Sequence, residues 1–237
     1  MNTAIACRGL TKFYGTQCAV ENVAFDVRSG TVCALLGRNG SGKSTTLRML
    51  LGLSVPDAGT ALIQGSPYAE LDDPARVVGA AVTDVAGHPA FEVRTQLRML
   101  AHAVKASRQR VDEVLEQIGL TDAQFRKIDT LSVGMRQRLS LGCALMGSPE
   151  ILVLDEPASG LDPDGIRWLR TFLKDFADQG GTVLLSSHSL DEVQRIAHDV
   201  VLVNRTVLYA GLLSDLVTGG HDDSLEDAFY RVTNEES

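Results

Sequence analysis

A glycine-rich segment between an apolar run and a helical pattern constrains this chain more than any other feature. Residues 37–45 read GRNGSGKST, which matches the phosphate-loop pattern GxxxxGK[ST]. The near-continuous apolar run at 31–36 predicts a strand buried on both faces of a parallel sheet. Leucines spaced along 44–53, before Pro56, predict a helix. Strand, glycine loop and helix in this order predict an α/β fold built around a phosphate-binding loop.

The loop supplies the groups that bind nucleotide phosphates. Its glycines let successive backbone N–H groups turn inward around a phosphate, and the start of the helix adds the positive end of its dipole. Lys43 reaches the β- and γ-phosphates, and the Ser44 hydroxyl ligates Mg²⁺. We therefore expect a nucleoside triphosphate with Mg²⁺, and ATP as the nucleotide. The expected contacts are Gly37, Arg38, Asn39, Gly40, Ser41, Gly42, Lys43, Ser44 and Thr45.

Two carboxylates follow a second buried run. Asp155 and Glu156 come directly after the apolar residues 151–154. Ligands of open α/β sheets collect at the carboxyl ends of the strands, and hydrophobic burial does not explain two acids there. Asp155 is suited to the Mg²⁺ shell, while Glu156 can accept a proton from the water that attacks the γ-phosphate, or orient that water. Taken alone the pair could be a solvated turn, but beside a phosphate loop it predicts hydrolysis.

The other apolar runs indicate two kinds of sheet. Short runs bounded by turn signals, at 5–7, 18–20 and 23–27, predict strands of a small, partly antiparallel sheet. The run at 182–185 follows a helical segment at 165–178, and this alternation of strand and helix predicts a parallel sheet with right-handed crossovers.

The middle of the chain and its end are expected to differ from this core. Helical periodicity over about 86–145 predicts an inserted helical subdomain within a domain that spans 1–218. The tail 219–237 is acidic and polar, with one short helix expected over 225–229.

Charge and composition exclude several classes of protein. The formal net charge of -8 argues against a nucleic-acid partner, because such proteins usually present a basic stripe. No apolar run approaches the ~18–20 residues that cross a bilayer, and the first residues do not resemble a secretion signal. A cytoplasmic protein is expected, with any membrane role through a partner. The four cysteines have no zinc-site spacing and are expected to be reduced: Cys7, Cys18, Cys33 and Cys143.

The segment LSVGM at 131–135 gains its meaning from its place in the chain. Taken alone it is a weak signal, because a serine that caps a helix with a glycine nearby is common. It lies between the phosphate loop and ILVLDEP at 151–157, and SGLD at 159–162 and then His188 follow. In this order the segments resemble the ATP-binding subunit of ABC transporters over nearly the whole chain.

The resemblance implies a fold and a set of roles. The fold is a P-loop NTPase core of the RecA-like type with a parallel sheet, an N-terminal antiparallel β subdomain and an inserted α-helical subdomain. Ser132 and Gly134 of one subunit cap the ATP held on the phosphate loop of another, as the signature motif does. His188 corresponds to the switch histidine, and Tyr14 to the aromatic residue that stacks on adenine. Without this frame, Tyr14 and His188 would be interpreted as structural residues.

The same resemblance implies partners. Two ATPase subunits, expected to be a homodimer, would meet head to tail and act with a separate integral-membrane permease on the cytoplasmic face of the membrane. Two segments are similar to sequences of the exporter branch that includes bacitracin-type and multidrug ATPases. They are DEPASGLDPDGIRWLR at 155–170 and the ending at 224–229. Export of an antibiotic, peptide or drug-like substrate is expected. The alternatives are a non-transport ABC ATPase acting on DNA or ribosomes, and an ATP-binding switch without turnover.

The chain departs from the family pattern at three places. Val133 and Met135 replace a Gly and a Gln of the signature, and both changes leave Ser132 and Gly134 in place. Thr83 stands where the Q-loop Gln is expected, with Asp84 beside it as another possible oxygen donor. Because the shorter Thr side chain offers one hydroxyl, Mg²⁺ is expected to depend mainly on Ser44 and Asp155.

Overall fold

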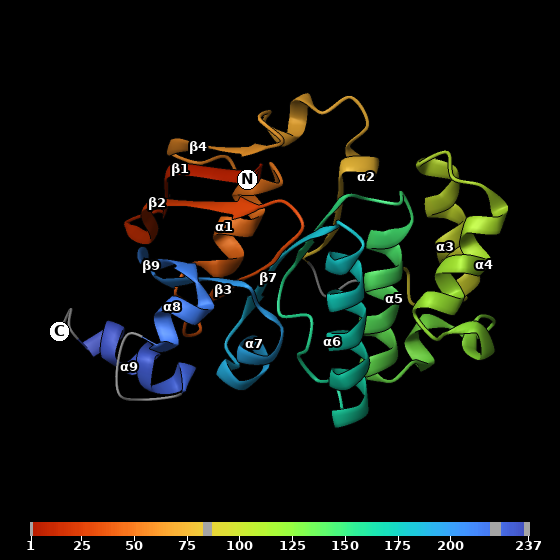
Figure 1. Ribbon diagram of the computed structural model, residues 1–237. Coiled ribbons are helices and arrows are strands. Elements are labelled where there is room, and N and C mark those ends of the chain that lie inside the picture. The colour runs from red at the N-terminus through yellow and green to blue at the C-terminus, as the bar shows by residue number, and fades with distance from the viewer. Residues whose placement is uncertain (1, 83–86, 219–223, 235–237) are drawn as a thin grey trace.

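The computed structural model describes residues 2–82, 87–218 and 224–234. A small sheet and a larger sheet lie next to each other, and helices α3, α4 and α5 extend to one side of them (Figure 1). Thr83 and Asp84, the two residues at the expected Q-loop position, lie outside the described residues.

The small sheet is antiparallel, as predicted. Its strands are ordered β2-β1-β4, with β1 (Thr3–Tyr14) in the middle between β2 (Gln17–Arg28) and β4 (Ala58–Ile63). Alternate residues of β1 such as Ile5 and Cys7 are buried toward the larger sheet. Burial raises the pKa of the Cys7 thiol to about 12, so this cysteine is an unreactive part of the core.

The larger sheet carries the predicted parallel strands. Its order is β5-β6-β7-β3-β8-β9, and every neighbouring pair is parallel except β8 with β9. The strands are β3 (Val32–Leu36), β5 (Val78–Ala81), β6 (Ile151–Leu154), β7 (Thr182–Ser187), β8 (Asp199–Asn204) and β9 (Thr206–Leu212). Since β6, β7 and β3 are adjacent and parallel, the segments that follow them emerge at one edge of the sheet.

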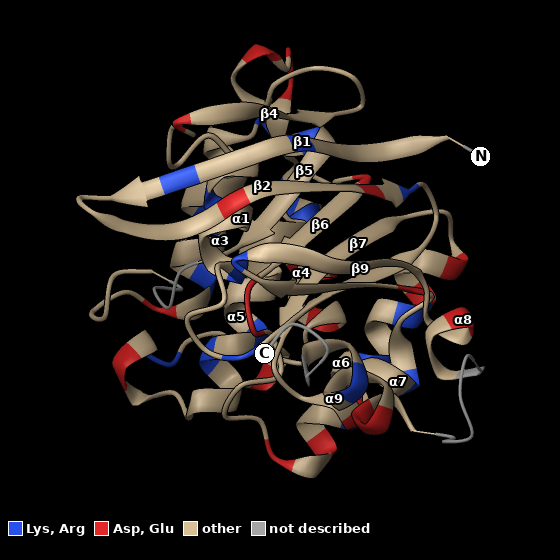
Figure 2. Cartoon of the chain, turned by 90° about the vertical axis from the view of Figure 1, so that its left-hand side faces the viewer, with Lys and Arg blue, Asp and Glu red and all other residues tan. Residues whose placement is uncertain are grey.

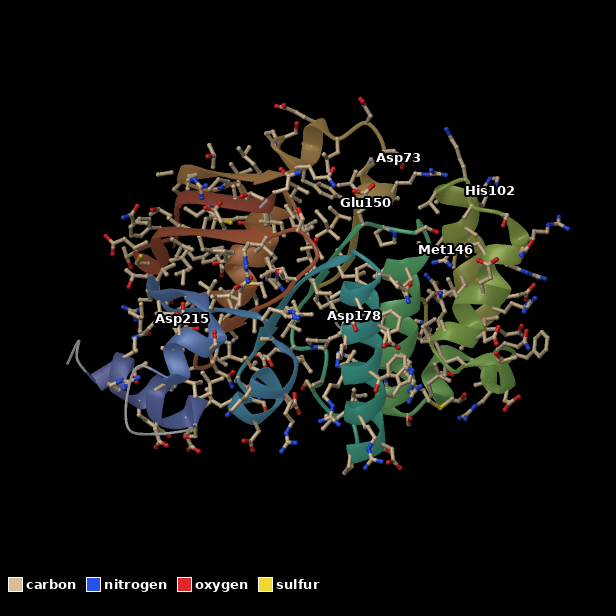
Figure 3. All side chains as sticks on the ribbon, in the orientation of Figure 1. Asp73, His102, Met146, Glu150, Asp178 and Asp215 are labelled. Carbon is tan, nitrogen blue, oxygen red and sulfur yellow. The ribbon has the colours of Figure 1, made fainter. Side chains whose placement is uncertain are left out.

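Both faces of the larger sheet are covered, which explains its continuous apolar runs. Val32, Ala34 and Leu36 of β3 belong to the core under the helices, whereas Cys33 and Leu35 belong to the core shared with the small sheet. Side chains fill the space between these layers (Figure 3). The helices that flank the sheet are α1 (Lys43–Leu50), α2 (Pro74–Val77), α6 (Pro163–Asp178), α7 (Leu190–Ile196), α8 (Leu213–Thr218) and α9 (Leu225–Asn234).

Three long helices occupy most of the range in which a helical subdomain was expected. They are α3 (Val93–Ala103), α4 (Arg108–Gln117) and α5 (Val133–Leu145). Short 3-10 turns at Thr121–Ala123 and Ile128–Thr130 lie between α4 and α5, and another at Tyr68–Glu70 lies before this range. Arg138 of α5 donates a hydrogen bond to the Ile118 carbonyl at 3.1 Å and lies 3.9 Å from the Trp168 ring centroid. One cation on α5 therefore joins the end of α4 to helix α6 of the core.

Acidic and basic residues are mixed over the part of the chain that the structure describes. In Figure 2 the acidic and basic positions are interspersed along the elements. Among the described residues, no helix has the length and hydrophobicity needed to span a membrane.

We predict that Asp199→Ala destabilises the fold strongly. The Asp199 carboxylate accepts from Arg28 Nε at 2.9 Å and from Arg28 Nη2 at 2.6 Å, which ties β2 of the small sheet to β8 of the larger one. Because Asp199 is buried while the Arg28 side chain is 31% exposed, we expect a loss of about 2–3 kcal/mol in the free energy of unfolding, less than for a fully buried pair.

Denaturation by urea measures this loss, with Asp26→Ala as the control. Asp26 of β2 pairs with Arg8 of β1 within the small sheet, and both side chains are about half exposed. Removal of this carboxylate should therefore lower the free energy of unfolding by no more than ~1 kcal/mol. Equal losses for the two variants would contradict the structural role of the Arg28–Asp199 pair.

Candidate nucleotide-binding site

The loop between β3 and α1 needs glycine at two positions for steric reasons. A Cβ atom at Gly37 would lie 2.2 Å from the Val203 carbonyl oxygen and 2.5 Å from Ser41 Oγ. Gly42 has a φ of +101°, and a Cβ atom there would lie 2.2 Å from Val20 Cγ1. The loop is therefore pressed against β2 and β8. The first backbone N–H groups of α1 have no partner within the helix, as at any helix start.

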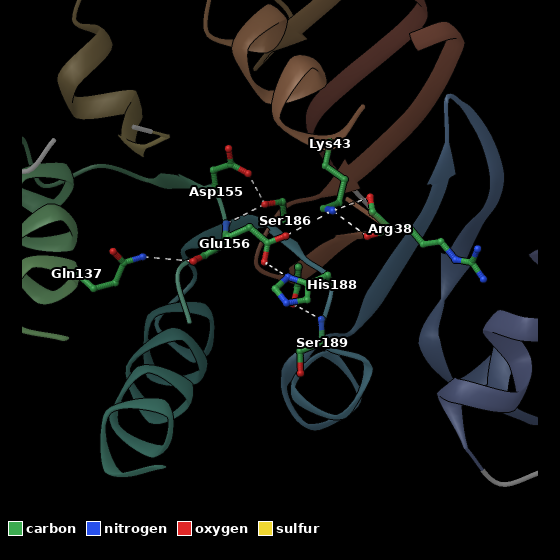
Figure 4. A network of polar contacts seen from close by, with 10 residues as sticks. Arg38, Lys43, Gln137, Asp155, Glu156, Ser186, His188 and Ser189 are labelled. Carbon is green, nitrogen blue, oxygen red and sulfur yellow. Dashed lines mark hydrogen bonds and ion pairs between the residues drawn. The ribbon is translucent and has the colours of Figure 1, made fainter. Parts of the chain in front are cut away.

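Lys43 is a buried cation at the start of α1. Its side chain is 5% exposed, and its Nζ donates to the carbonyl oxygens of Gly37 at 2.8 Å and Arg38 at 3.3 Å. Nζ also lies 3.4 Å from Oε1 of Glu156 (Figure 4). These contacts hold a positive charge over the loop, where phosphate oxygens would be bound.

Glu156 connects three parts of the site. Its Oε1 faces Lys43, and its Oε2 lies 2.8 Å from Nδ1 of His188, which follows β7. Its backbone has a φ of +47°, in the left-handed region that is uncommon for residues other than glycine. The structure therefore brings together the predicted Lys43, Asp155, Glu156 and His188 at the carboxyl edge of the sheet.

Two further residues hold the acidic segment in place. Ser186 Oγ donates to Oδ1 of Asp155 and accepts from the backbone N–H of Glu156 at 2.8 Å (Figure 4). Gln137 of α5 donates to the Glu156 carbonyl oxygen at 3.3 Å. The sequence pattern did not identify either residue as functional. Ser186 directly extends the buried run at 182–185, and a polar residue there was the only available signal.

A second carboxylate, that of Glu192, interacts electrostatically with His188 and Glu156. Burial raises the pKa of Glu192 on α7, and the neighbouring negative charge of Glu156 adds to the rise, while His188 opposes it. Glu156 contacts the imidazole directly, whereas Glu192 on α7 interacts with it through its charge.

Ser132 and Gly134 lie at the start of α5. Ser132 Oγ accepts from the Met135 N–H at 3.2 Å, which is the helix cap expected from the sequence. Ser132 is exposed, and so is half of the Val133 side chain. This helix start presents its N–H groups and its cap to the surface of the subunit.

Tyr14 ends β1 with its ring on the surface. It is 52% exposed, which excludes the interpretation as a core residue. Asp57 holds the segment before it by accepting from the Phe13 N–H at 2.7 Å and from Lys12 Nζ at 3.1 Å. These hydrogen bonds lower the pKa of Asp57, with the Phe13 N–H contributing most.

The residues present fit a nucleotide with Mg²⁺. Ser44 and Asp155 offer hydroxyl and carboxylate oxygens, the ligand types that Mg²⁺ prefers when phosphates supply the remainder. Within the described part of the chain, no group of three or more His, Cys, Asp or Glu forms a metal site by itself. The buried Ser41 Oγ in the loop has no hydrogen-bond partner there. Such a set needs the phosphates to complete it.

Comparisons with known proteins identify the family of this chain. The family model described as ABC transporter matches residues 20–159. The chain belongs to the ABC transporter ATP-binding family. It is 35% identical over 231 residues to the uncharacterized ABC transporter ATP-binding protein YdbJ of Bacillus subtilis, covering 96% of this chain and 74% of that protein.

Two other similarities support the assignment. The chain is 36% identical over 207 residues to the bacitracin transport ATP-binding protein BcrA of Bacillus licheniformis, covering 86% of this chain and 68% of that one. A solved ATP-binding subunit of an ABC transporter superposes with a TM-score of 0.87 at 27% identity, covering 98% of this chain and all of the other. This ABC ATPase has the predicted fold and binds ATP.

We predict that Gly37→Ala weakens ATP binding by at least about tenfold, because the added methyl group would collide with the Val203 carbonyl and displace the loop. Equilibrium titration with ATP measures the change. Gly65→Ala is the control, since Gly65 has a φ of +87° with nothing within 4 Å of the added Cβ. It should cost about 1–2 kcal/mol of stability and leave ATP affinity unchanged. Wild-type affinity in Gly37→Ala would contradict this account of the loop.

Proposed function

We propose that this ABC ATPase hydrolyses Mg²⁺-bound ATP and that the hydrolysis drives export through a separate membrane permease. One observation carries the proposal. The Glu156 carboxylate is held between Lys43 of the phosphate loop and His188, at the edge where the γ-phosphate would lie.

The residues bind and orient the nucleotide in a definite way. The loop N–H groups and Lys43 bind the phosphates, and Tyr14 stacks on the adenine. Ser44 and Asp155 would hold Mg²⁺, which when bound neutralises charge on the β- and γ-phosphate oxygens. Loop residues from Gly37 to Thr45 would form the cradle around the phosphates.

Glu156 acts on water. In the structure its Oε1 faces Lys43, so phosphates that attract Lys43 release this oxygen for the attacking water. Glu156 then accepts a proton from the water, or orients it, while His188 steadies the other carboxylate oxygen and contacts the γ-phosphate.

A second copy of the chain completes the site. Ser132 and Gly134 lie at an exposed helix start, and N–H groups at such a start favour anions. In a head-to-tail homodimer, this start would cap the γ-phosphate held on the partner's loop. Within one subunit the Ser132 hydroxyl accepts from the Met135 N–H as a helix cap.

The transport role extends from the relatives to this chain. BcrA is by name a bacitracin transport protein, which supports an antibiotic, peptide or drug-like cargo here. We place the subunit at the cytoplasmic face of the membrane, bound to an integral-membrane permease, with residues 1–218 as the ATPase domain, about 86–145 as its helical subdomain and 219–237 as a tail. The net charge of -8 disfavours the alternative of an ATPase acting on DNA or ribosomes.

We predict that Glu156→Gln retains ATP binding but loses turnover by on the order of 10²–10⁴-fold and accumulates an ATP-bound dimer, because the amide cannot take up a proton. Phosphate release and ATP titration measure the two effects separately. Lys43→Ala should instead lose ATP affinity. Glu150→Gln, at the opposite end of β6, is the matched control and should behave as wild type. Wild-type turnover in Glu156→Gln would refute the assignment.

We predict that Ser132→Arg reduces hydrolysis by on the order of 10²-fold while each monomer still binds ATP, because the large cation blocks closure over the partner's phosphates. An excess of this variant should also change the activity of wild-type subunits. Ser107→Arg is the control, since Ser107 is another exposed serine that caps a helix, α4. If an excess of Ser132→Arg subunits leaves the activity of wild-type subunits unaltered, the proposal that two subunits share each ATP site is wrong for this protein.

A further inference from the structure

We propose that Ser186 is a positioning residue that sets the relative placement of the metal-binding Asp155 and the water-activating Glu156. This inference rests on the roles proposed above for the two acids.

The sheet places Ser186 between the strand that leads to the acidic pair and the strand that leads to the phosphate loop. β7 lies between β6 and β3, with Leu185 paired to Leu154 and Ser186 paired to Leu35. Ser186 is therefore level with the residue that follows β6, which is Asp155. Its side chain is completely buried, so solvent does not compete for its hydrogen bonds.

The Ser186 hydroxyl is used in both directions. A serine hydroxyl has one proton to donate and two lone pairs to accept with. Here the proton goes to Oδ1 of Asp155, and a lone pair accepts the Glu156 N–H at 2.8 Å. One oxygen atom thus fixes the carboxylate of the first acid and the backbone of the second.

The second of these bonds supports a strained turn. Glu156 has a φ of +47°, and a left-handed conformation at a residue other than glycine persists only where its surroundings hold it. Ser186 holds the N–H of Glu156, and Gln137 holds its carbonyl oxygen at 3.3 Å. The turn directs the carboxylate toward Lys43 and His188. Loss of the hydroxyl should therefore disturb both acids together.

A purely structural hydroxyl offers the necessary comparison. Thr182 lies at the opposite end of β7, is 3% exposed, and accepts the Gly30 N–H through Oγ1 at 3.0 Å. Thr182→Val removes a buried hydroxyl of β7 that does not contact Asp155 or Glu156. Ser186→Ala removes the hydroxyl of the same strand that contacts both acids.

The experiment compares Ser186→Ala, Thr182→Val and wild type in steady-state hydrolysis. Ser186→Ala should lower kcat by about 10–100-fold, the usual effect of losing a partner that orients a metal ligand, with the KM for ATP within about twofold. Thr182→Val should lower the denaturation midpoint but leave kcat unchanged. Wild-type kcat in Ser186→Ala would overturn the proposal.

A binding measurement adds a readout that does not depend on turnover. In a Glu156→Gln background that retains ATP, Mn²⁺ serves as the probe, and Ser186→Ala should weaken its binding by about tenfold or more. ATP affinity measured in EDTA should be unaltered. Unaltered Mn²⁺ affinity would show that the hydroxyl does not position Asp155 and would overturn the proposal.

Two further variants keep the test decisive. If Ser186→Ala does not fold, Ser186→Cys replaces it, because a thiol is a weak donor and acceptor and should also reduce kcat. Ser186→Thr keeps the hydroxyl and should recover more activity than either. Wild-type kcat in Ser186→Cys would also contradict the proposal.

The Glu156→Gln variant alone tests the proposed function. If Glu156→Gln hydrolyses ATP normally, the assignment of Glu156 as the base has failed, whatever the result for Ser186→Ala.

Discussion

The parallel pairing of β6, β7 and β3 is the constraint on which the site depends. Because three neighbouring strands run in the same direction, their carboxyl ends deliver the acidic pair, His188 and the phosphate loop to one edge. The hydrogen bonds between strands fix the register, and burial on both faces keeps the sheet between two layers of apolar side chains. The chemistry thus follows from backbone pairing among residues far apart in the sequence.

Electrostatic interactions then position the charged side chains at this edge of the sheet. Lys43 is almost completely buried, and it satisfies its charge with two loop carbonyls and Glu156. A buried cation without an anionic partner would be unfavourable, so the same arrangement that stabilises the subunit alone also prepares it for phosphates. His188 remains half exposed and can follow Glu156 or a phosphate.

The sequence predicted those parts of the site whose chemistry is local. The phosphate loop is one continuous stretch of sequence, and Asp155 and Glu156 are neighbours in another. The apolar run before each of them has the length and composition of a buried strand. Ser186 and Gln137 were missed because their roles arise from strand register and helix packing, which no short pattern records. The β8–β9 hairpin had no counterpart among the predicted elements, and helix α9 begins at Leu225 as predicted but extends to Asn234. The Q-loop hypothesis at Thr83 stays a prediction.

The most direct test of the central claim measures phosphate release from ATP by the wild-type chain, with Mg²⁺ and with a chelator, over a range of protein concentrations. A site assembled at this sheet edge and completed by a second copy predicts release that requires Mg²⁺ and a rate per subunit that rises with protein concentration. Tight ATP binding without phosphate release at any concentration would contradict the account and would identify the chain as an ATP-dependent switch.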